Sequence, residues 1–249
     1  MEEHQDPRAR LTAGTRFSRL IHVQSCESTQ VLAQQDHEPG SAAFWADHQT
    51  GGRGRQGHAW HDEAARDLTV TFKVAGLRLA NPAQLAAVVP VAVLDVLEQV
   101  SGLRLTLKWP NDLMVTGRKI AGILIDSLGT PPVHLIGVGI NVNRTGFPPE
   151  LRGSASSLAL VTGHEYDRAD LLVHLAIGLD DALAELAPGR IDRLLGLFRE
   201  RLGLLGRRVV LTAGGKEQSG RLTGLDFDHA TLDAGAPIPL AIVQGLRLQ

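Results

Sequence analysis

The chain has 249 residues, of which 43% are hydrophobic, so it can form one large domain or a medium domain joined to a small one. Its 25 basic and 27 acidic residues give a formal net charge of −2, which argues against a protein whose main task is to coat nucleic acid. The single cysteine, Cys26, excludes an internal disulfide and favours a reducing compartment.

The N-terminal segment predicts neither a signal peptide nor a membrane anchor. It begins MEEHQDPRAR, which is charged and has no apolar core, and we expect residues 1–15 to form a flexible tail. The most apolar stretch, residues 85–94, is about half as long as the ~20 residues that span a bilayer. We therefore expect a cytoplasmic protein that does not cross a membrane.

The first half of the chain predicts strands followed by one long helix. Residues 16–23 and 42–46 are expected to be strands, and Ser28 between them can cap a short helix. Residues 68–74 alternate apolar and polar side chains with the period of a half-buried strand. Asn81 is then the expected N-cap of a helix whose apolar residues recur at helical spacing.

The second half of the chain predicts further strands, then helices, then a small β-module. Four strands are expected in a hairpin-like pattern, at residues 105–108, 113–115, 119–126 and 133–142. Gly137 and Gly139 in the last strand indicate that another group approaches it closely. Helices are expected at residues 168–186 and 190–202. After Gly206, short strands alternate with glycine-rich turns, which is compatible with a little barrel.

The sequence GGRGRQGHAW, residues 51–60, predicts a mobile loop that can bind an anion. Its glycines let the backbone fold around a polyanion, and Arg53 and Arg55 supply planar donors for carboxylate or phosphate oxygens. Such a loop can become ordered when a ligand arrives and screen a reactive intermediate from water. A solvated surface loop is the alternative, and the pattern supports neither a dinucleotide fingerprint nor a Walker loop.

The KWPND segment, residues 108–112, places a cation and a carboxylate at one strand end. Asp112 can hold Mg²⁺ or receive a proton from an amine, although Pro-Asn-Asp is also favourable turn chemistry. In GRKIAGIL, residues 117–124, Lys119 is expected to face opposite to Arg118. A lysine on the covered face of a strand is costly without an anion, which favours a ligand role for Lys119.

The GVGINVN segment, residues 137–143, contains Asn141, whose amide can contact a base or a sugar. Most strands of this composition are simply core, and that alternative stays open. His58 and His61 invite a zinc interpretation, but no further Cys or His spacing supports it.

Taken together and in this order, these segments resemble the biotin protein ligases, also called biotin–acetyl-CoA carboxylase ligases. The resemblance is carried by Ser28-Thr29, by Gln49 with GRGRQG, by KWPND, by GRKIAGIL and by GVGINVN, and it extends from about residue 16 to the end. It implies an α+β fold, with a class II synthetase-like catalytic domain over residues 16–204 that has a mixed, mainly antiparallel sheet and helices. It also implies a small SH3-like β-barrel over residues 205–249.

The resemblance implies a reaction in two steps. Biotin and ATP, with Mg²⁺, give biotinyl-5′-AMP and pyrophosphate, and a lysine of a biotin carboxyl carrier protein (an acetyl-CoA carboxylase subunit) then displaces AMP. A homodimer is plausible by the same analogy. Long family members carry an operator-binding domain, for which about 15 residues before the first strand are too few, so we expect no nucleic-acid partner and no repressor activity.

The resemblance also assigns roles to residues at matching positions. Biotin contacts are expected from Ser28, Thr29, Gln49, Arg53, Arg55, Lys119 and Gly122. Nucleotide contacts are expected from Arg55, Trp60, Lys108, Asn111, Asp112, Asn141 and Arg247. Catalytic roles fall to Lys119, Arg53, Arg55 and Asp112, and Asp112 is also the expected metal ligand. A carboxylate is already a nucleophile, so the first step needs cations rather than a base.

Three other functions compete with this one. A lipoate ligase shares the catalytic fold class, but GRGRQG together with KWPND speaks against it. A non-catalytic biotin sensor or adaptor would not need Arg53, Arg55 and Lys119, which favour turnover. A nucleic-acid binder could use the basic loop, but the net charge disfavours it.

Overall fold

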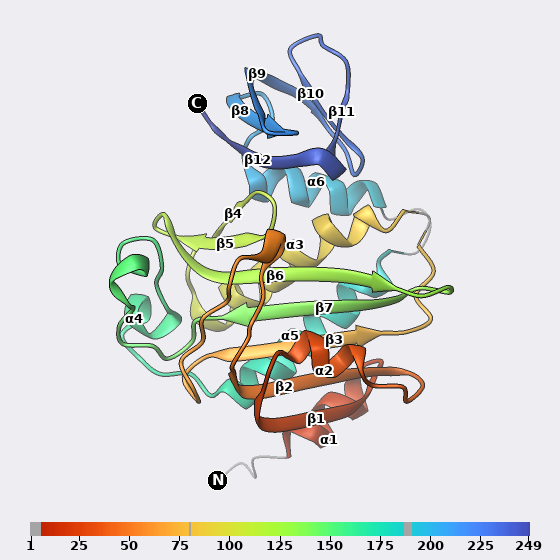
Figure 1. Ribbon diagram of the computed structural model, residues 1–249, viewed down its shortest axis with the longest axis vertical. Coiled ribbons are helices and arrows are strands. Elements are labelled where there is room, and N and C mark those ends of the chain that lie inside the picture. Colours follow the sequence, from red (N-terminus) through yellow and green to blue (C-terminus); the bar gives the residue numbers. More distant parts are fainter. Residues whose placement is uncertain (1–5, 80, 187–190) are drawn as a thin grey trace.

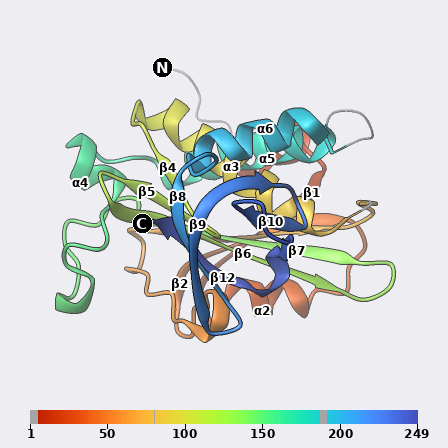
Figure 2. The ribbon, with the colours of Figure 1, turned by 90° about the horizontal axis from the view of Figure 1, so that it is seen from above.

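The structure is a computed structural model that describes residues 6–79, 81–186 and 191–249. It contains a seven-stranded sheet with helices on both faces and a separate five-stranded sheet formed by the C-terminal part of the chain (Figure 1). Figure 2, turned by 90°, shows helices α3, α5 and α6 on one side of the large sheet and the short helix α2 on the other. Helix α1 packs against α5. The site described below lies on the α2 side.

The large sheet has the strand order β1-β2-β3-β7-β6-β5-β4, and it is antiparallel except for the β1–β2 pair. Its strands are β1 (Phe17–Cys26), β2 (Ser41–Gln49), β3 (Leu68–Val74), β4 (Thr106–Lys108), β5 (Asp112–Val115), β6 (Arg118–Leu128) and β7 (Val133–Ile140). Each predicted strand of this region is present. The mixed, mainly antiparallel catalytic sheet is therefore confirmed.

The helices that cover the sheet form a continuous apolar core with it. They are α1 (Pro7–Gly14), α2 (Thr29–Gln34), α3 (Ala83–Ser101), α4 (Leu158–Thr162), α5 (Arg168–Ala184) and α6 (Ile191–Leu202). Helix α3 packs on α5 and α6, and eleven of its residues are buried. By length and hydropathy α3 could span a membrane, which the ten-residue estimate from sequence missed, but most of it is buried inside the fold.

Helix α3 begins at Ala83, two residues after the predicted cap. The Asn81 side chain nevertheless accepts a hydrogen bond from the Ala83 backbone N–H at 2.9 Å, as an N-cap does. Helix boundaries commonly differ by one or two residues between definitions, so the predicted start is confirmed within that margin.

Two expectations about the first 74 residues are wrong. Residues 7–14, expected within a flexible tail, form helix α1, which Asp6 caps and Leu11 anchors in the core with 0% exposure. The other error concerns β3, which is buried on both faces rather than half-buried. The large helices cover one face, and on the other Thr71 lies beneath α2, where its hydroxyl bonds to Thr29 and Gln30.

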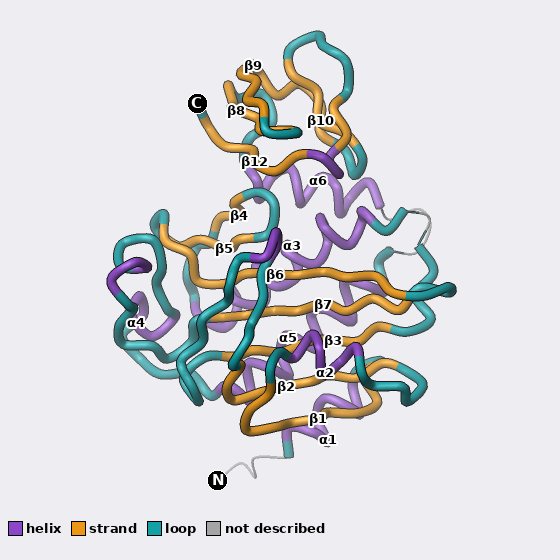
Figure 3. The backbone as a smooth tube through the Cα atoms, in the orientation of Figure 1, coloured by secondary structure: helices purple, strands orange, loops and turns teal. Residues whose placement is uncertain are grey.

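The C-terminal part of the chain is an antiparallel sheet with the order β11-β10-β9-β8-β12 (Figure 3). Its strands are β8 (Arg208–Ala213), β9 (Lys216–Leu225), β10 (His229–Leu232), β11 (Ile238–Pro239) and β12 (Val243–Leu248). Over the described residues, no pairing between β11 and β12 closes this sheet, so the expected SH3-like barrel is not confirmed. The sheet rests on α6, where Arg199 Nε donates to the Leu225 carbonyl at 2.6 Å.

A partly buried charge cluster ties β1 and β3 to the segment that follows α2, and it should make the stability of the fold depend on pH. Asp36 accepts from Arg19 at 2.7 Å and from Lys73 at 2.8 Å, and the Lys73 side chain is 7% exposed. The hydrogen bond from Arg19, together with Lys73, lowers the pKa of Asp36 from 3.8 to about 2. Because the folded pKa lies below the unfolded one, this stabilisation is present above pH ~4 and is lost as pH falls toward 2.

We therefore expect the free energy of unfolding to fall by about 1 to 2 kcal/mol more in the wild type than in Asp36→Asn between pH 5 and pH 2. Urea titrations of both proteins at several pH values measure this difference. If the free energy of unfolding of the wild type and that of Asp36→Asn differ by the same amount at every pH from 5 to 2, the prediction is wrong.

Candidate functional site

A cavity of about 470 Å³ lies between the α2 face of the large sheet, the loop that follows β2, and strand β12. Except for Asn141, every residue that the sequence placed in a site lines it. They are Ser28, Thr29, Gln49, Arg53, Arg55, Trp60, Lys108, Asn111, Asp112, Lys119, Gly122 and Arg247. These residues come from five segments of the chain, between residue 28 and residue 247, and the fold brings them to one place.

Asn141 lies outside this lining. Its side chain is buried, and the amide donates to the Ser156 carbonyl at 2.9 Å and to the Lys119 carbonyl at 3.4 Å. Both donors are therefore engaged in holding the segment before α4 against β6. The structure gives Asn141 a packing position behind Lys119, and its contact with a nucleotide stays a prediction.

The charge of the cavity is strongly one-sided. Its lining contains five cationic side chains, from Arg53, Arg55, Lys108, Lys119 and Arg247. Among the residues that the structure describes, Asp112 is the one carboxylate in the lining. A cavity with this excess of positive charge fits a ligand that carries several negative charges.

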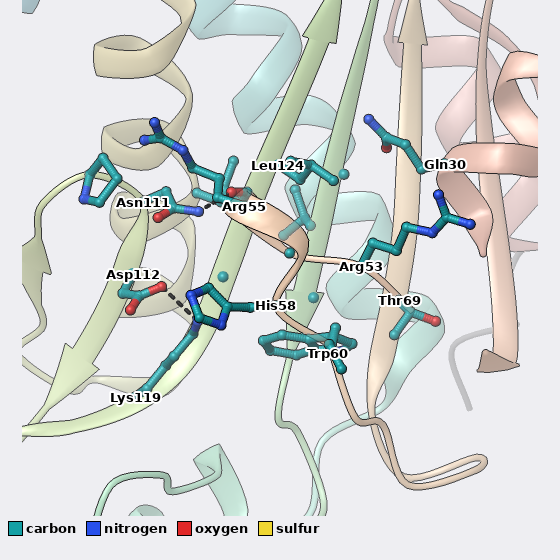
Figure 4. Close-up of a pocket in the computed structure, with 18 of the residues that line it drawn as sticks. Gln30, Arg53, Arg55, His58, Trp60, Thr69, Asn111, Asp112, Lys119 and Leu124 are labelled. Carbon is teal, nitrogen blue, oxygen red and sulfur yellow. Dashed lines mark hydrogen bonds and ion pairs between the residues drawn. The ribbon is translucent and has the colours of Figure 1, made fainter. Parts of the chain in front are cut away.

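Lys119 and Asp112 form an ion pair at the floor of the cavity. Lys119 Nζ lies 2.6 Å from Asp112 Oδ1 and 5.5 Å from the centre of the Trp60 ring, and Figure 4 shows the three side chains around His58. Arg118, the neighbour of Lys119, is exposed, as alternation along β6 predicted. Asp112 therefore fixes the position of the ammonium group.

The segment that carries Arg53 and Arg55, residues 51–60, forms a small hairpin over the cavity, and we call it the arginine loop. Arg53 and Ala59 make an isolated bridge, Trp60 N–H donates to the Gly52 carbonyl at 2.9 Å, and Gly54 N–H donates to the His58 carbonyl at 2.7 Å. Figure 4 shows Arg55 beside Asn111 and Arg53 on the side of Gln30 and Thr69.

The two loop arginines have different surroundings. Arg53 pairs with Glu27 at 2.7 Å, but both side chains are more than half exposed, so water screens this pair and it holds Arg53 only weakly. Arg55 is partly buried, and desolvation lowers the pKa of its guanidinium. An incoming anion can therefore recruit Arg53 at low cost and would relieve the desolvation of Arg55.

A chain of hydrogen bonds between neutral side chains forms the opposite wall. Gln49 Oε1 accepts from the Thr29 backbone N–H at 2.8 Å and from the Thr29 hydroxyl at 3.1 Å. Thr71 bonds to Thr29 at 2.9 Å and to Gln30 at 3.0 Å. Gln30 is held in turn by the Asp126 carboxylate, which lies outside the lining of this cavity, at 2.9 Å. This wall offers fixed polar groups without charge, which suits a neutral polar ligand group.

The glycines of β7 lie where other groups approach, as the sequence predicted. A Cβ atom at Gly137 would lie 2.8 Å from Gln30 Oε1, and one at Gly139 would lie 2.5 Å from the Trp60 ring. Gly122 on β6 also faces Trp60, at 3.1 Å. Only strands without side chains at these points let the indole lie flat on the sheet, so Gly122 and Gly139 determine where Trp60 sits.

Sequence reasoning missed several residues of the lining, notably Gln30, Thr69, Thr71 and Gln244. The signal for the two threonines was present, because they occupy the polar positions of the alternating strand β3. Gln30 directly follows the predicted Ser28-Thr29 pair. Gln244 gave no signal, because only the packing of the C-terminal sheet brings it to the cavity.

A second, larger cleft of about 900 Å³ adjoins the first. It shares Arg53, Arg55 and Asn111 with the charged cavity, so the arginine loop stands at the border of the two. Most of its walls are apolar, from Pro90, Trp109, Ile123, Phe198, Phe227 and Leu240. Three carboxylates, from Asp126, Asp226 and Asp228, also line it, so the charge of this cleft is more balanced than that of the first cavity.

Comparison with known proteins gives consistent results. A model of the Biotin/lipoate A/B protein ligase family matches residues 21–143. A biotin–[acetyl-CoA-carboxylase] ligase of Paracoccus denitrificans is 34% identical over 205 residues, which cover 79% of this chain and 85% of that protein. The bifunctional ligase/repressor BirA of Bacillus subtilis is 32% identical over 167 residues, and the match spans 51% of its length.

A solved structure is similar over nearly the whole chain. The biotin protein ligase of Aquifex aeolicus, determined in complex with biotin and ATP, has a TM-score of 0.82 and 28% identity. The match covers 94% of this chain and 100% of that one.

Proposed function

The chain belongs to the biotin protein ligase family, and on this basis we propose that it activates biotin as biotinyl-5′-AMP and transfers biotin to a lysine of a biotin carboxyl carrier protein. The observation that carries this proposal is the charge of the cavity, where five cations and one carboxylate lie next to a neutral polar wall. That combination suits a ligand with a neutral polar ring, an acid group and a polyphosphate. The Aquifex aeolicus relative was solved with biotin and ATP, which supports the same substrates here.

In the first step a biotin carboxylate oxygen forms a bond to the α-phosphorus of ATP, and the bond from that phosphorus to pyrophosphate breaks. Both reactants are anions, so they approach each other only where cations offset their repulsion. Lys119 supplies a positive charge at a fixed position, because Asp112 holds its ammonium group at 2.6 Å. The two loop arginines supply mobile positive charge. Thr29, Gln49 and Thr71 hold the neutral ring at the far wall.

Mg²⁺ enters this proposal with the nucleotide. Among the described residues there is no cluster of three or more His, Cys, Asp or Glu side chains that could hold a metal. Mg²⁺ in nucleotide sites is usually held by one or two carboxylates together with phosphates and water, and Asp112 fits that pattern. When bound, the ion would neutralise charge on the departing pyrophosphate.

In the second step the lysine amine of the carrier forms an amide bond to the biotin carbonyl carbon, and AMP leaves. The amine must lose a proton, and Asp112 is the carboxylate in the cavity to orient the amine or receive that proton. The apolar second cleft supports an approach by the carrier, because it adjoins the charged cavity and shares the arginine loop with it.

Other expectations from the sequence stay predictions. Arg247 lines the cavity but pairs with Glu217 at 3.0 Å on the exposed surface of the C-terminal sheet, and we propose that ATP competes for its guanidinium. Five further expectations also stay predictions. They are the SH3-like barrel, the homodimer, the boundary between the two domains at residue 204, the absence of repressor activity and the cytoplasmic location.

A direct assay tests the function. The protein is mixed with ATP, Mg²⁺, a biotin carrier domain and either biotin or lipoate, and the mass of the carrier domain is measured by intact-mass spectrometry. A biotin-sized increment on one lysine is expected. A lipoyl increment would identify a lipoate ligase, and no increment with either acid would favour a non-catalytic role.

A further inference from the structure

The segment that connects the arginine loop to β3, residues 61–67, lies outside the cavity lining. We call it the loop stem. It returns the chain from Trp60 to the sheet, so the positions of Arg53 and Arg55 over the cavity depend on it. Two separate sets of side-chain contacts hold it in place.

Asp62 fastens the stem to the strand that enters the loop. Its side chain is 1% exposed, and both carboxylate oxygens accept from the Gln49 backbone N–H at 3.2 Å. The same carboxylate lies 3.0 Å from His48 Nδ1. Gln49 is the residue whose side chain holds Thr29 in the polar wall, so Asp62 links the loop stem to that wall.

Arg144 fastens the stem from the opposite side. Its Nη2 donates to the His61 carbonyl, and its Nε lies 2.6 Å from Asp67 Oδ2, with both side chains almost fully buried. Asp67 also accepts from the Glu63 backbone N–H at 2.7 Å and from Val142 N–H at 3.3 Å. Arg144 and Asp67 therefore connect the stem to the ends of β3 and β7.

The tip of the loop has no comparable anchors among its described side chains. We define the tip as residues 52–59. Its one ion pair, between Arg53 and Glu27, is exposed, and the backbone N–H groups of Gly54 and His58 donate to carbonyls within the tip itself. The tip has few buried contacts and the stem has several. We therefore expect local motion to be confined to the tip and to stop at Trp60.

We propose that Asp62 and Arg144 are positioning residues that clamp the loop stem, so that only the arginine-bearing tip moves when it closes over the acyl-adenylate. This inference rests on the proposed function for its ligand, but the clamp itself is a property of the free protein. A fixed stem shortens the segment that must become ordered on closure, and it returns both guanidinium groups to the same positions in each cycle.

Asp62→Ala is the variant that tests the clamp, because it removes one anchor and leaves the buried Arg144–Asp67 pair intact. Asp180→Ala is the control, since it also removes an aspartate that forms an ion pair, here between Asp180 on helix α5 and Arg16, and it leaves the loop stem untouched. The first measurement is hydrogen–deuterium exchange of residues 59–67 in the ligand-free proteins. We expect at least tenfold faster exchange in Asp62→Ala and wild-type exchange in Asp180→Ala.

The second measurement is the escape of biotinyl-AMP, followed by rapid filtration after the protein has been given biotin and ATP. We expect escape to be about tenfold faster or more in Asp62→Ala, with similar thermal stability of the two variants. Asp62→Asn, which keeps an acceptor for the Gln49 N–H, should restore much of the retention.

Unchanged exchange of residues 59–67 in Asp62→Ala would overturn the clamp. Faster exchange with wild-type retention of the adenylate would overturn its positioning role. If the wild type forms no biotinyl-AMP, the proposed function fails, and the ligand-free exchange comparison still decides whether Asp62 clamps the stem.

Discussion

Replacing Lys119 with alanine is expected to slow formation of biotinyl-AMP by a factor of about 10² to 10³, the usual cost of removing one donor from a preorganised site. Lys119 is the cation that the strand itself delivers to the cavity, and Asp112 holds its ammonium group at 2.6 Å. The loop cations reach the cavity from the segment that follows β2, whereas Lys119 extends from strand β6 of the sheet. Biotin-dependent exchange of labelled pyrophosphate into ATP measures this step without any carrier protein.

Arg118→Ala is the matched control for Lys119→Ala. The two residues are neighbours on β6, both are cationic, and Arg118 faces solvent while Lys119 lines the cavity. Net charge changes equally in the two variants, so a difference between them reports position rather than charge. Exchange rates near wild type in Lys119→Ala, or equal losses in both variants, would reject the assigned role.

Asp112→Ala would also disturb Lys119, because the ion pair would be lost. Lys119 is about one-third exposed, however, so water would still reach its ammonium group. We therefore attribute a loss in Lys119→Ala to the missing charge at the cavity floor, and we expect the variant to keep the wild-type unfolding midpoint within the small range typical of exposed ion pairs.

The strands that position the site could be predicted from sequence because their signals are local. Alternation in residues 68–74, turn chemistry at Gly117 and the glycines of β7 each depend on a few neighbouring residues. Lys119 could be placed in the site by the same local logic, since alternation along β6 sets its direction. The resemblance of the motifs then indicated which cations share one ligand.

The remaining features depend on tertiary packing, which no short segment contains. Helix α1 has one large apolar side chain, Leu11, which is also its one buried residue, so no apolar periodicity in the sequence marks this helix, which packs on β1 and α5. The amide of Asn141 is engaged by backbone carbonyls of a distant segment. The anchors of the loop stem join Asp62 to Gln49 and Arg144 to His61, pairs that are 13 and 83 residues apart, so no local pattern marks them.

Replacing Arg55 with alanine should impair both half-reactions, because Arg55 lines both the charged cavity and the apolar cleft. Its guanidinium is partly buried, desolvation lowers its pKa, and Figure 4 shows it beside Asn111. The positive charge is therefore destabilised until an anion arrives, and binding of the adenylate phosphate should give back part of that cost. We expect adenylate formation to fall by about 10²-fold, with faster escape of the adenylate that does form.

Arg55→Lys separates charge from geometry at this position. A lysine keeps the positive charge but cannot make the two parallel hydrogen bonds that a guanidinium makes to phosphate, so we expect only partial recovery of adenylate retention. Pyrophosphate exchange measures the first half-reaction, and single-turnover transfer from preformed biotinyl-AMP to the carrier measures the second. Full recovery of adenylate retention in Arg55→Lys would mean that charge alone suffices at this position. A normal rate of transfer to the carrier in Arg55→Ala would mean that Arg55 does not act where the cavity meets the cleft.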